Sequence, residues 1–240
     1  MCVTDAVATG VPFSTLADTV LERLTATYAP AADPERAAPM RAYMKDVAPF
    51  LGLTTPARRA LSRTVVAGLP RPDESDCTAI ALRCWQLPER EYHYFAVDYL
   101  RRHARVCSSG FLPVARHLIA TTSWWDTVDL LAAHVVGALV AADPALKADM
   151  DTWIVDDDLW IARTALLHQL RYKERTDTER LFTYCLRQSG HPDFFVRKAI
   201  GWCLREYAKT DPEAVRAFLA RERGRFAPLS VREALKNIGA

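Results

Sequence analysis

The sequence predicts an all-α protein with the architecture of a HEAT-like helical-repeat solenoid. The chain has only 9 glycines, and no Asn-Gly or Asp-Gly turn lies between alternating segments, so no hairpin is indicated. Valine, isoleucine and threonine do not gather into the alternating runs that are typical of strands. Prolines instead stand where helices would begin, which favours helices throughout.

The expected helix starts pair a proline at a plausible first helical position with a capping or acidic neighbour. The clearest of them lie at residues 33–35, 55–56, 87–89, 143–144 and 211–213. Most of the 14 prolines therefore separate helices, and we expect roughly twelve helices of about 10 to 16 residues.

A coarse repeat supports the stacking of these helices. It is marked by Trp85, Trp125, Trp160 and Trp202, at intervals of 40, 35 and 42 residues. A loose period of this size is typical of antiparallel helix pairs stacked as a solenoid with a concave face. We expect residues 16–240 to form this single domain, and residues 1–15, which carry no clear pattern, to form a loose leader.

Composition excludes several classes of protein. The 240 residues are 50% hydrophobic and 25% charged, which is ample for a core. A net charge of +2, from 31 basic and 29 acidic residues, excludes both an acidic disordered tail and a histone-like polycation. Only six of the basic residues are lysines. The arginine excess suits recognition of oxyanions, although a high genomic G+C content would have the same effect.

Charge is distributed unevenly along the chain. Residues 41–116 carry 12 basic and 7 acidic side chains, a difference of +5, and residues 160–205 carry 9 and 4, again +5. Residues 141–159 carry one lysine and six aspartates, a difference of −5. The two basic segments could line one groove with positive charge, or they could be ordinary solvated helix faces.

We expect a cytoplasmic protein that is not inserted in a membrane. The longest apolar stretch, at residues 130–142, contains His134 and is too short to span a bilayer, and no secretory signal begins the chain. The six cysteines form no CxxC pair, and no His/Cys cluster has zinc spacing. The cysteines are therefore interpreted as reduced thiols, and no metal site is expected.

The segment TTSWWDTVD, at residues 121–129, does not look like ordinary core. Ser123 can cap a helix that begins at Trp124. On that helix Trp125 and Asp129 are i,i+4 neighbours, so an indole and a carboxylate would lie side by side and could receive a cation. The alternative is a core tryptophan and a solvated aspartate. The core stripe of the same helix would consist of Trp124, Val128, Leu131 and Val135.

Arg163 falls inside the leucine stripe of the helix expected at residues 159–170. A buried arginine needs a partner, and an oxyanion is the natural one. A structural ion pair with one of the aspartates at 156–158 is the alternative. Arg171 and Lys173 follow at the helix end, where they could extend a track of phosphate contacts or complement the helix dipole.

A third unusual segment covers residues 194–207. Trp202 lies off the core stripe of the expected helix, near Phe195 and Ala199, with Gly201 beside it. A glycine inside a helix costs about 1 kcal/mol relative to alanine, so close approach by another group would explain it. The core stripe itself would consist of Val196, Ile200, Cys203 and Tyr207.

At these segments the sequence resembles the AlkD-like DNA alkylation repair family, the HEAT-like-repeat alkylpurine DNA glycosylases. The resemblance covers residues 33–238. It is carried by the blocks PMRAYMKDVAPFLGL from Pro39, LPERE from Leu87, TTSWWDTVD from Thr121, LWIARTALLHQLRYKERTD from Leu159, FFVRKAIGWCLREYAKTDP from Phe194 and PLSVREALK from Pro228.

The resemblance implies a C-shaped solenoid that holds duplex DNA in a basic concave groove. It identifies Trp125 and Asp129 with the second tryptophan and second aspartate of SWWDxxD. It also identifies Arg163 with the arginine of LWxxRxA, Trp202 with the tryptophan of IGWxLREYAKT, and Tyr43 with the tyrosine of YMK. We expect Asp129, Trp125 and Trp202 to be catalytic. The expected DNA-binding residues are Arg163, Tyr43, Lys45, Arg171, Lys173 and Arg197.

The implied activity is hydrolysis of the N-glycosidic bond of cationic purines, such as N3-alkyladenine and N7-alkylguanine, in duplex DNA. An abasic site would remain, and the resemblance implies that the base is not flipped into a pocket. No lysine presents itself as a Schiff-base nucleophile, so we expect a monofunctional, monomeric glycosylase without metal or organic cofactor. The alternatives are a non-catalytic helical-repeat scaffold that binds DNA structures and a protein-interaction module.

Overall fold

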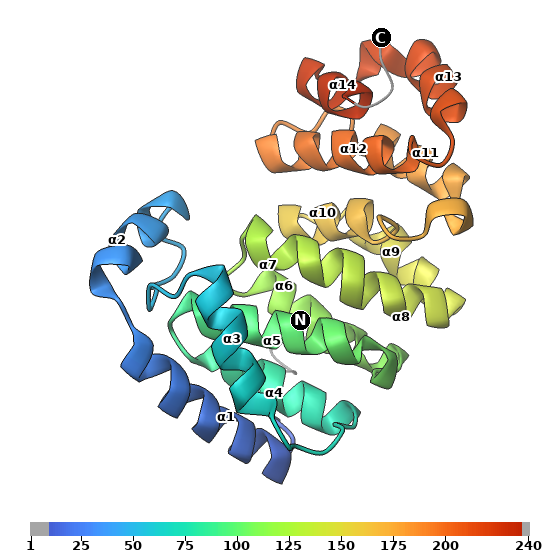
Figure 1. The fold of residues 1–240 in the computed structure, drawn as a ribbon. Coiled ribbons are helices and arrows are strands. Elements are labelled where there is room, and N and C mark those ends of the chain that lie inside the picture. Colours follow the sequence, from blue (N-terminus) through green and yellow to red (C-terminus); the bar gives the residue numbers. More distant parts are fainter. Residues whose placement is uncertain (1–9, 237–240) are drawn as a thin grey trace. The chain divides into compact units, whose positions relative to one another are not determined.

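The computed structural model describes residues 10–236, and this part of the chain contains helices and no strand (Figure 1). The predicted all-α class is confirmed. The chain divides into two compact units, residues 1–127 and 128–240, and each is described by itself. The prediction that residues 16–240 form one domain stays a prediction. Residues 1–9 of the expected leader lie outside the described residues, and Ser14 already caps the first helix.

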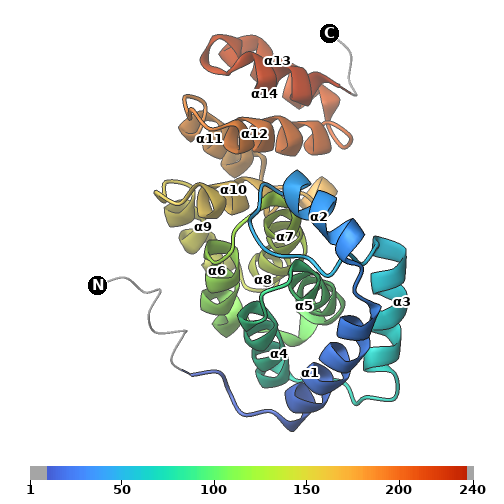
Figure 2. The same cartoon turned by 90° about the vertical axis from the view of Figure 1, so that its left-hand side faces the viewer.

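The first unit consists of helices that pack through α1, α4 and α5 (Figure 2). Buried aromatic side chains of these helices, among them Tyr28, Tyr92 and Phe95, form its core. Its elements are α1 (Thr15–Tyr28), η2 (Ala29–Ala31), α2 (Pro34–Tyr43), α3 (Thr55–Val66), α4 (Glu74–Gln86), α5 (Arg90–His103), η3 (Ala104–Val106), η4 (Ser109–Phe111), α6 (Leu112–Ala120) and the start of α7 (Trp125–Leu130).

The second unit is a stack in which α10 packs against both its chain neighbours and α12. A π-helical segment, η5, continues α7. The helix expected to be α-helical throughout therefore contains a stretch with the i→i+5 hydrogen bonds of a π-helix. The elements of the second unit are η5 (Leu131–Val136), α8 (Gly137–Ala142), η6 (Pro144–Leu146), α9 (Lys147–Trp153), α10 (Leu159–Leu167), η7 (Lys173–Arg175), α11 (Thr178–Arg187), α12 (Phe194–Tyr207), α13 (Pro212–Glu222), η8 (Arg223–Arg225) and α14 (Pro228–Leu235).

Helices α2 and α13 begin where a proline beside an aspartate predicted a helix start. The Asp33 carboxylate accepts a bond from the Arg36 amide at the start of α2, and the Asp211 carboxylate does the same for Ala214 at the start of α13. Each aspartate precedes a proline in the first turn, where the missing amide hydrogen costs nothing. At Asp143 the same signal begins only the 3₁₀ turn η6.

The apolar helix that runs from Trp125 to Ala142 is longer than the sequence suggested. Its 18 residues have a mean hydropathy of 1.4 and are half buried, so by length and composition alone it could cross a membrane. A core helix of a soluble protein has the same properties, and Val128, Leu131 and Val135 are fully buried here as predicted. The absence of a membrane-spanning segment stays a prediction.

Helices α12 and α14 touch through their backbones at Gly201, side by side in both views (Figures 1 and 2). A Cβ at residue 201 would lie 2.8 Å from the Ser230 carbonyl oxygen and closer still to Glu233 Cβ. Ser230 Oγ also donates a hydrogen bond of 2.8 Å to the Arg197 carbonyl. The expected close approach at Gly201 is therefore confirmed, and its cause is α14.

We expect Gly201→Ala to lower the free energy of unfolding by about 2 kcal/mol, because the methyl group must push two helix backbones apart. Urea unfolding followed by circular dichroism measures this. Gly190→Ala is the matched control, since no atom lies within 4 Å of a Cβ at residue 190. Equal effects of the two substitutions would contradict the close packing at Gly201.

His168, at the end of α10, is fully buried and its Nδ1 lies 2.7 Å from the Ala165 carbonyl oxygen. Burial lowers its pKa from 6.5 to about 4. The folded state therefore binds this proton at a lower pH than the unfolded state does. Its contribution to stability is present above pH 6.5 and is lost progressively down to about pH 4, by about 3 kcal/mol in total.

We expect His168→Gln to weaken the acid destabilisation of the protein. The free energy of unfolding should fall by about 2 kcal/mol less between pH 7 and pH 4.5 in this variant than in the wild type, because glutamine binds no proton. Denaturant titrations at the two pH values measure the difference. An unchanged pH dependence would mean that His168 is not held neutral by the fold.

Candidate active site

The candidate site of the second unit is built on α10, a helix in which every residue from Trp160 to Leu167 is buried. Asp158 begins this helix by accepting a 2.8 Å hydrogen bond from the Trp160 amide. Ile161, Leu166 and Leu167 are buried, and Arg163 among them is only 1% exposed. A guanidinium in such surroundings is stable only with complete hydrogen bonding.

Asp129 supplies part of that bonding through a bidentate ion pair. Nε of Arg163 donates to Oδ1 of Asp129 at 2.7 Å, and Nη2 donates to Oδ2 at 2.8 Å. Nη1 donates to the carbonyl oxygen of Phe195, in the first turn of α12. The predicted alternative of an ion pair with the aspartates at 156–158 is wrong, because Asp158 caps α10 and the carboxylate on Arg163 is that of Asp129.

Trp202 of α12 lies beside this pair. The Arg163 guanidinium carbon is 5.3 Å from the centroid of the indole ring, within the range of a cation–π contact. Lys198 Nζ and the Arg205 guanidinium lie 5.5 and 5.8 Å from the same ring. The indole Nε1 of Trp202 is buried without a hydrogen-bond partner among the described residues.

The arrangement holds a partly accessible carboxylate in one orientation. The Asp129 side chain is 15% exposed while its partner Arg163 is 1% exposed, so Asp129 is the member of the pair that solvent or a ligand can reach. Each carboxylate oxygen accepts one bond from Arg163, and the two parallel bonds fix the orientation of the carboxylate. Asp129 can therefore stabilise a positive charge or accept a proton from water without changing its rotamer.

The structure brings Asp129, Arg163 and Trp202 together, and Trp125 lies four residues before Asp129 on the same helix, α7, as the sequence predicted. Trp125, the first residue of α7, is half-buried and belongs to the first unit. Tyr43 ends α2 and is 72% exposed, and Lys45 follows it with a positive φ of 58°.

The remaining predicted DNA-binding residues lie on the surface of the second unit or are engaged by its backbone. Arg171 and Lys173 are exposed, and Lys173 has a positive φ of 52°. Arg197 Nε donates a 2.8 Å hydrogen bond to the His191 carbonyl. Lys198, the next residue, was not singled out from the sequence, yet it lies between the rings of Phe194 and Trp202.

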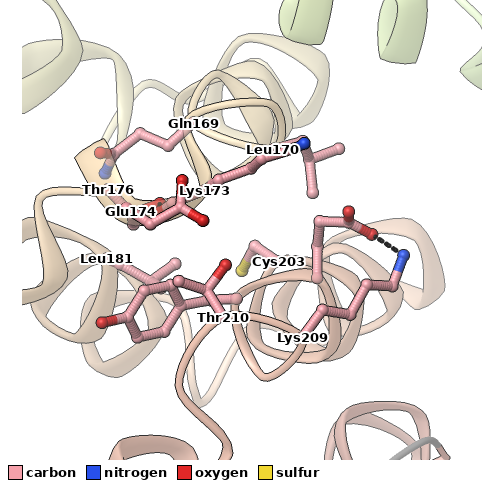
Figure 3. Close-up of a pocket in the computed structure, with 11 residues that line it drawn as sticks. Gln169, Leu170, Lys173, Glu174, Thr176, Leu181, Cys203, Lys209 and Thr210 are labelled. Carbon is pink, nitrogen blue, oxygen red and sulfur yellow. Dashed lines mark hydrogen bonds and ion pairs between the residues drawn. The ribbon is translucent and has the colours of Figure 1, made fainter.

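Lys173 also lines a cavity of about 310 Å³ between η7, α11 and α12 (Figure 3). Its lining includes Leu181 and Cys203, together with Glu206 and Lys209, which form an ion pair of 2.5 Å. The lining contains none of Asp129, Arg163 and Trp202. This cavity is therefore separate from the candidate site.

Sequence reasoning missed a second buried arginine–carboxylate pair, in the first unit. Arg90 is 1% exposed, and its Nε and Nη2 donate to Oδ2 and Oδ1 of Asp126 at 3.0 and 2.6 Å. Glu91, fully buried, accepts hydrogen bonds from the three consecutive amides of residues 51–53 at 2.9 to 3.0 Å. The signal available was the adjacent pair of opposite charges in the block LPERE.

The chain turns sharply just before α7, and this turn differs from the predicted cap. Ser123 Oγ donates to the Ile119 carbonyl at 2.6 Å, and the helix begins at Trp125 rather than Trp124. Thr122 has a positive φ of 50°, a conformation that costs a β-branched residue about 1–3 kcal/mol. Its surroundings must therefore hold the turn in place.

Comparison with known proteins assigns this helical chain to a class. The sequence model of the family described as DNA alkylation repair enzyme matches residues 24–238, and the chain belongs to this family. A solved structure, a predicted DNA alkylation repair enzyme from Enterococcus faecalis, is similar over 86% of this chain and 96% of its own, with 30% identity and a TM-score of 0.78. That similarity confirms the helical-repeat fold. No curated protein matches the chain.

We expect Asp129→Asn to lower the free energy of unfolding by about 3 kcal/mol, because it leaves the Arg163 guanidinium buried without a counter-charge. Asp151→Asn is the control, since Asp151 also pairs with an arginine, Arg180, at 2.9 Å but is 45% exposed. It should cost less than about 1 kcal/mol. Thermal and urea unfolding of both variants measure the difference, and equal costs would contradict the burial of the Asp129–Arg163 pair.

Proposed function

We propose that this DNA alkylation repair protein is a monofunctional glycosylase that hydrolyses the N-glycosidic bond of cationic alkylated purines in duplex DNA. The observation that carries the proposal is the Asp129 carboxylate, reachable from solvent and fixed on both oxygens by Arg163, whose guanidinium lies against the Trp202 ring. A rigid negative charge beside an aromatic face suits a reaction in which positive charge develops.

The chemistry follows from the charge of the substrate. N3-alkyladenine and N7-alkylguanine are cationic, so the base leaves with the bonding electrons as a neutral purine and needs no general acid. Positive charge develops on the deoxyribose as its C1′–N bond breaks. Asp129 stabilises that charge and accepts a proton from the water that adds to C1′, which leaves an abasic site.

The contacts of Arg163 support a role different from the phosphate contact that the sequence suggested. All three of its hydrogen-bonding nitrogens are engaged, by Asp129 and by the Phe195 carbonyl, and its side chain is 1% exposed. Arg163 then acts as a positioning residue for Asp129. Lys198 is better placed for a backbone phosphate, since it is less buried and lies against Trp202.

Trp125 and Trp202 would contact the lesion nucleotide, and Tyr43, Lys45, Arg171 and Lys173 would contact the duplex. The exposure of Tyr43, Lys45, Arg171 and Lys173 supports this, since a phosphate backbone can reach them. We retain the expectation that the damaged base stays in the stack. The deoxyribose rather than the base would then face Asp129.

The deciding experiment is single-turnover release of 7-methylguanine from a defined duplex. The wild type should release the base and leave an unbroken strand that alkali cleaves. Asp129→Asn should react at least about 100-fold more slowly, because charge stabilisation in the transition state is lost. Asp151→Asn, the matched carboxamide control, should react at the wild-type rate, and circular dichroism checks that both variants are folded.

Two outcomes would contradict the proposal. If the wild type binds duplex DNA with a steep salt dependence but releases no alkylated purine, a non-catalytic DNA-binding scaffold is favoured instead. If it does not bind DNA, a protein-interaction module is favoured. Equal release by the wild type and Asp129→Asn would keep the activity and remove Asp129 from its mechanism.

A further inference from the structure

The buried ion pair of the first unit joins the first turn of α5 to the turn that precedes α7. Besides its two bonds to Asp126, Arg90 donates from Nη1 to the Thr122 carbonyl at 2.7 Å and from Nη2 to Thr127 Oγ1 at 2.9 Å. Asp126 accepts a further bond of 2.6 Å from the Tyr94 hydroxyl. One guanidinium thus bonds to three residues on both sides of Trp124 and Trp125.

Asp126 is saturated by these contacts. Its two oxygens accept bonds from Arg90 Nε, Arg90 Nη2, the Tyr94 hydroxyl and the Thr127 amide. Its side chain is 7% exposed. Of the two carboxylates in TTSWWDTVD, Asp126 is therefore occupied within the fold, and its removal from water is compensated by four donors.

The turn held by Arg90 is one that the chain would not keep unaided. Thr122 has its φ at 50°, where a β-branched side chain crowds the backbone. Arg90 holds the carbonyl of this residue, and Trp85 Nε1 holds the preceding carbonyl of Thr121 at 3.1 Å. A strained turn that is fixed by buried donors sets the direction in which the next helix starts.

We propose that Arg90 and Tyr94 are positioning residues that act through Asp126 and the Thr122 turn to hold the Trp125 indole in its working orientation. This inference rests on the proposed function, in which Trp125 contacts the lesion nucleotide. Tyr94 supports the assignment because burial and the neighbouring Asp126 charge raise its pKa above the usual range, so its hydroxyl keeps the proton that it donates.

The chain offers a matched pair of substitutions for the test. Tyr94→Phe removes one hydroxyl donor from Asp126, and Tyr184→Phe removes an equivalent donor that lies 2.7 Å from Asp151 in the second unit. Both carboxylates also bind an arginine. The two variants therefore lose the same kind of hydrogen bond, and only one of them touches the Thr122 turn.

The first measurement needs no substrate. In protein labelled with 5-fluorotryptophan, the ¹⁹F resonance of Trp125 is identified by its loss in Trp125→Phe. Tyr94→Phe should broaden or split this resonance, and Tyr184→Phe should leave it unchanged. An unchanged Trp125 resonance in Tyr94→Phe would overturn the proposal.

The second measurement is the single-turnover rate on the 7-methylguanine duplex. Tyr94→Phe should slow release about fivefold, the equivalent of one hydrogen bond, while Tyr184→Phe should not. Equal rates in the two variants would also overturn the proposal. If the wild type itself releases no base, the proposed function fails, and the fluorine resonance still decides whether Tyr94 positions Trp125.

Rescue separates positioning from a general loss of stability. Glycine adopts a positive φ without steric cost, so Thr122→Gly removes the strain that the Arg90 contacts oppose. Combined with Tyr94→Phe, it should restore a single sharp Trp125 resonance and most of the excision rate. A double variant that is more disordered at Trp125 than Tyr94→Phe alone would show that the Thr122 turn is not what these contacts hold.

Discussion

Buried arginine–carboxylate pairing is the interaction on which the functional parts of this molecule depend. Each unit contains a guanidinium that is almost completely removed from water, Arg90 in one and Arg163 in the other, and each is matched by a bidentate aspartate. An unpaired charge in either place would cost several kcal/mol. The segment that contains both aspartates, residues 121–129, is therefore held by its charges rather than by apolar packing alone.

The two aspartates of that segment differ in burial and therefore in role. Asp126 accepts bonds from four donors and is 7% exposed, so its charge is held within the fold, whereas Asp129 is 15% exposed and can be reached from solvent. Two carboxylates three residues apart thus acquire different roles from their surroundings. Both arginines bond to protein partners: Arg90 bonds to Asp126 and two neighbouring threonines, and Arg163 bonds to Asp129 and the Phe195 carbonyl.

The sequence predicted the helical class because helix-start signals and the spacing of apolar residues are local properties of the chain. Asp33 and Asp211 cap the helices that were predicted from the prolines that follow them. Gly201 lies at a close helix contact, as expected. Burial of Arg163 was also predicted, because a side chain in the middle of a leucine stripe points into the core together with the leucines.

The partner of Arg163 could not be foreseen, because it depends on how α7 and α10 pack. The aspartates at 156–158 were nearer along the chain, yet the carboxylate that reaches the guanidinium is 34 residues away. The Arg90–Asp126 pair was missed for the same reason, since it joins residues 36 positions apart. Ser123 misled the prediction of the helix start, because a residue with positive φ before it redirects the chain.

The contact between α12 and α14 has a mechanical consequence for Trp202. Because Gly201 places no side chain between the two backbones, α12 packs directly on α14 and cannot move closer to it without a clash. Glu233 of α14 adds an ion pair of 3.0 Å to Arg205, one turn further along α12. Helix α14 therefore stiffens α12, the helix that carries Trp202.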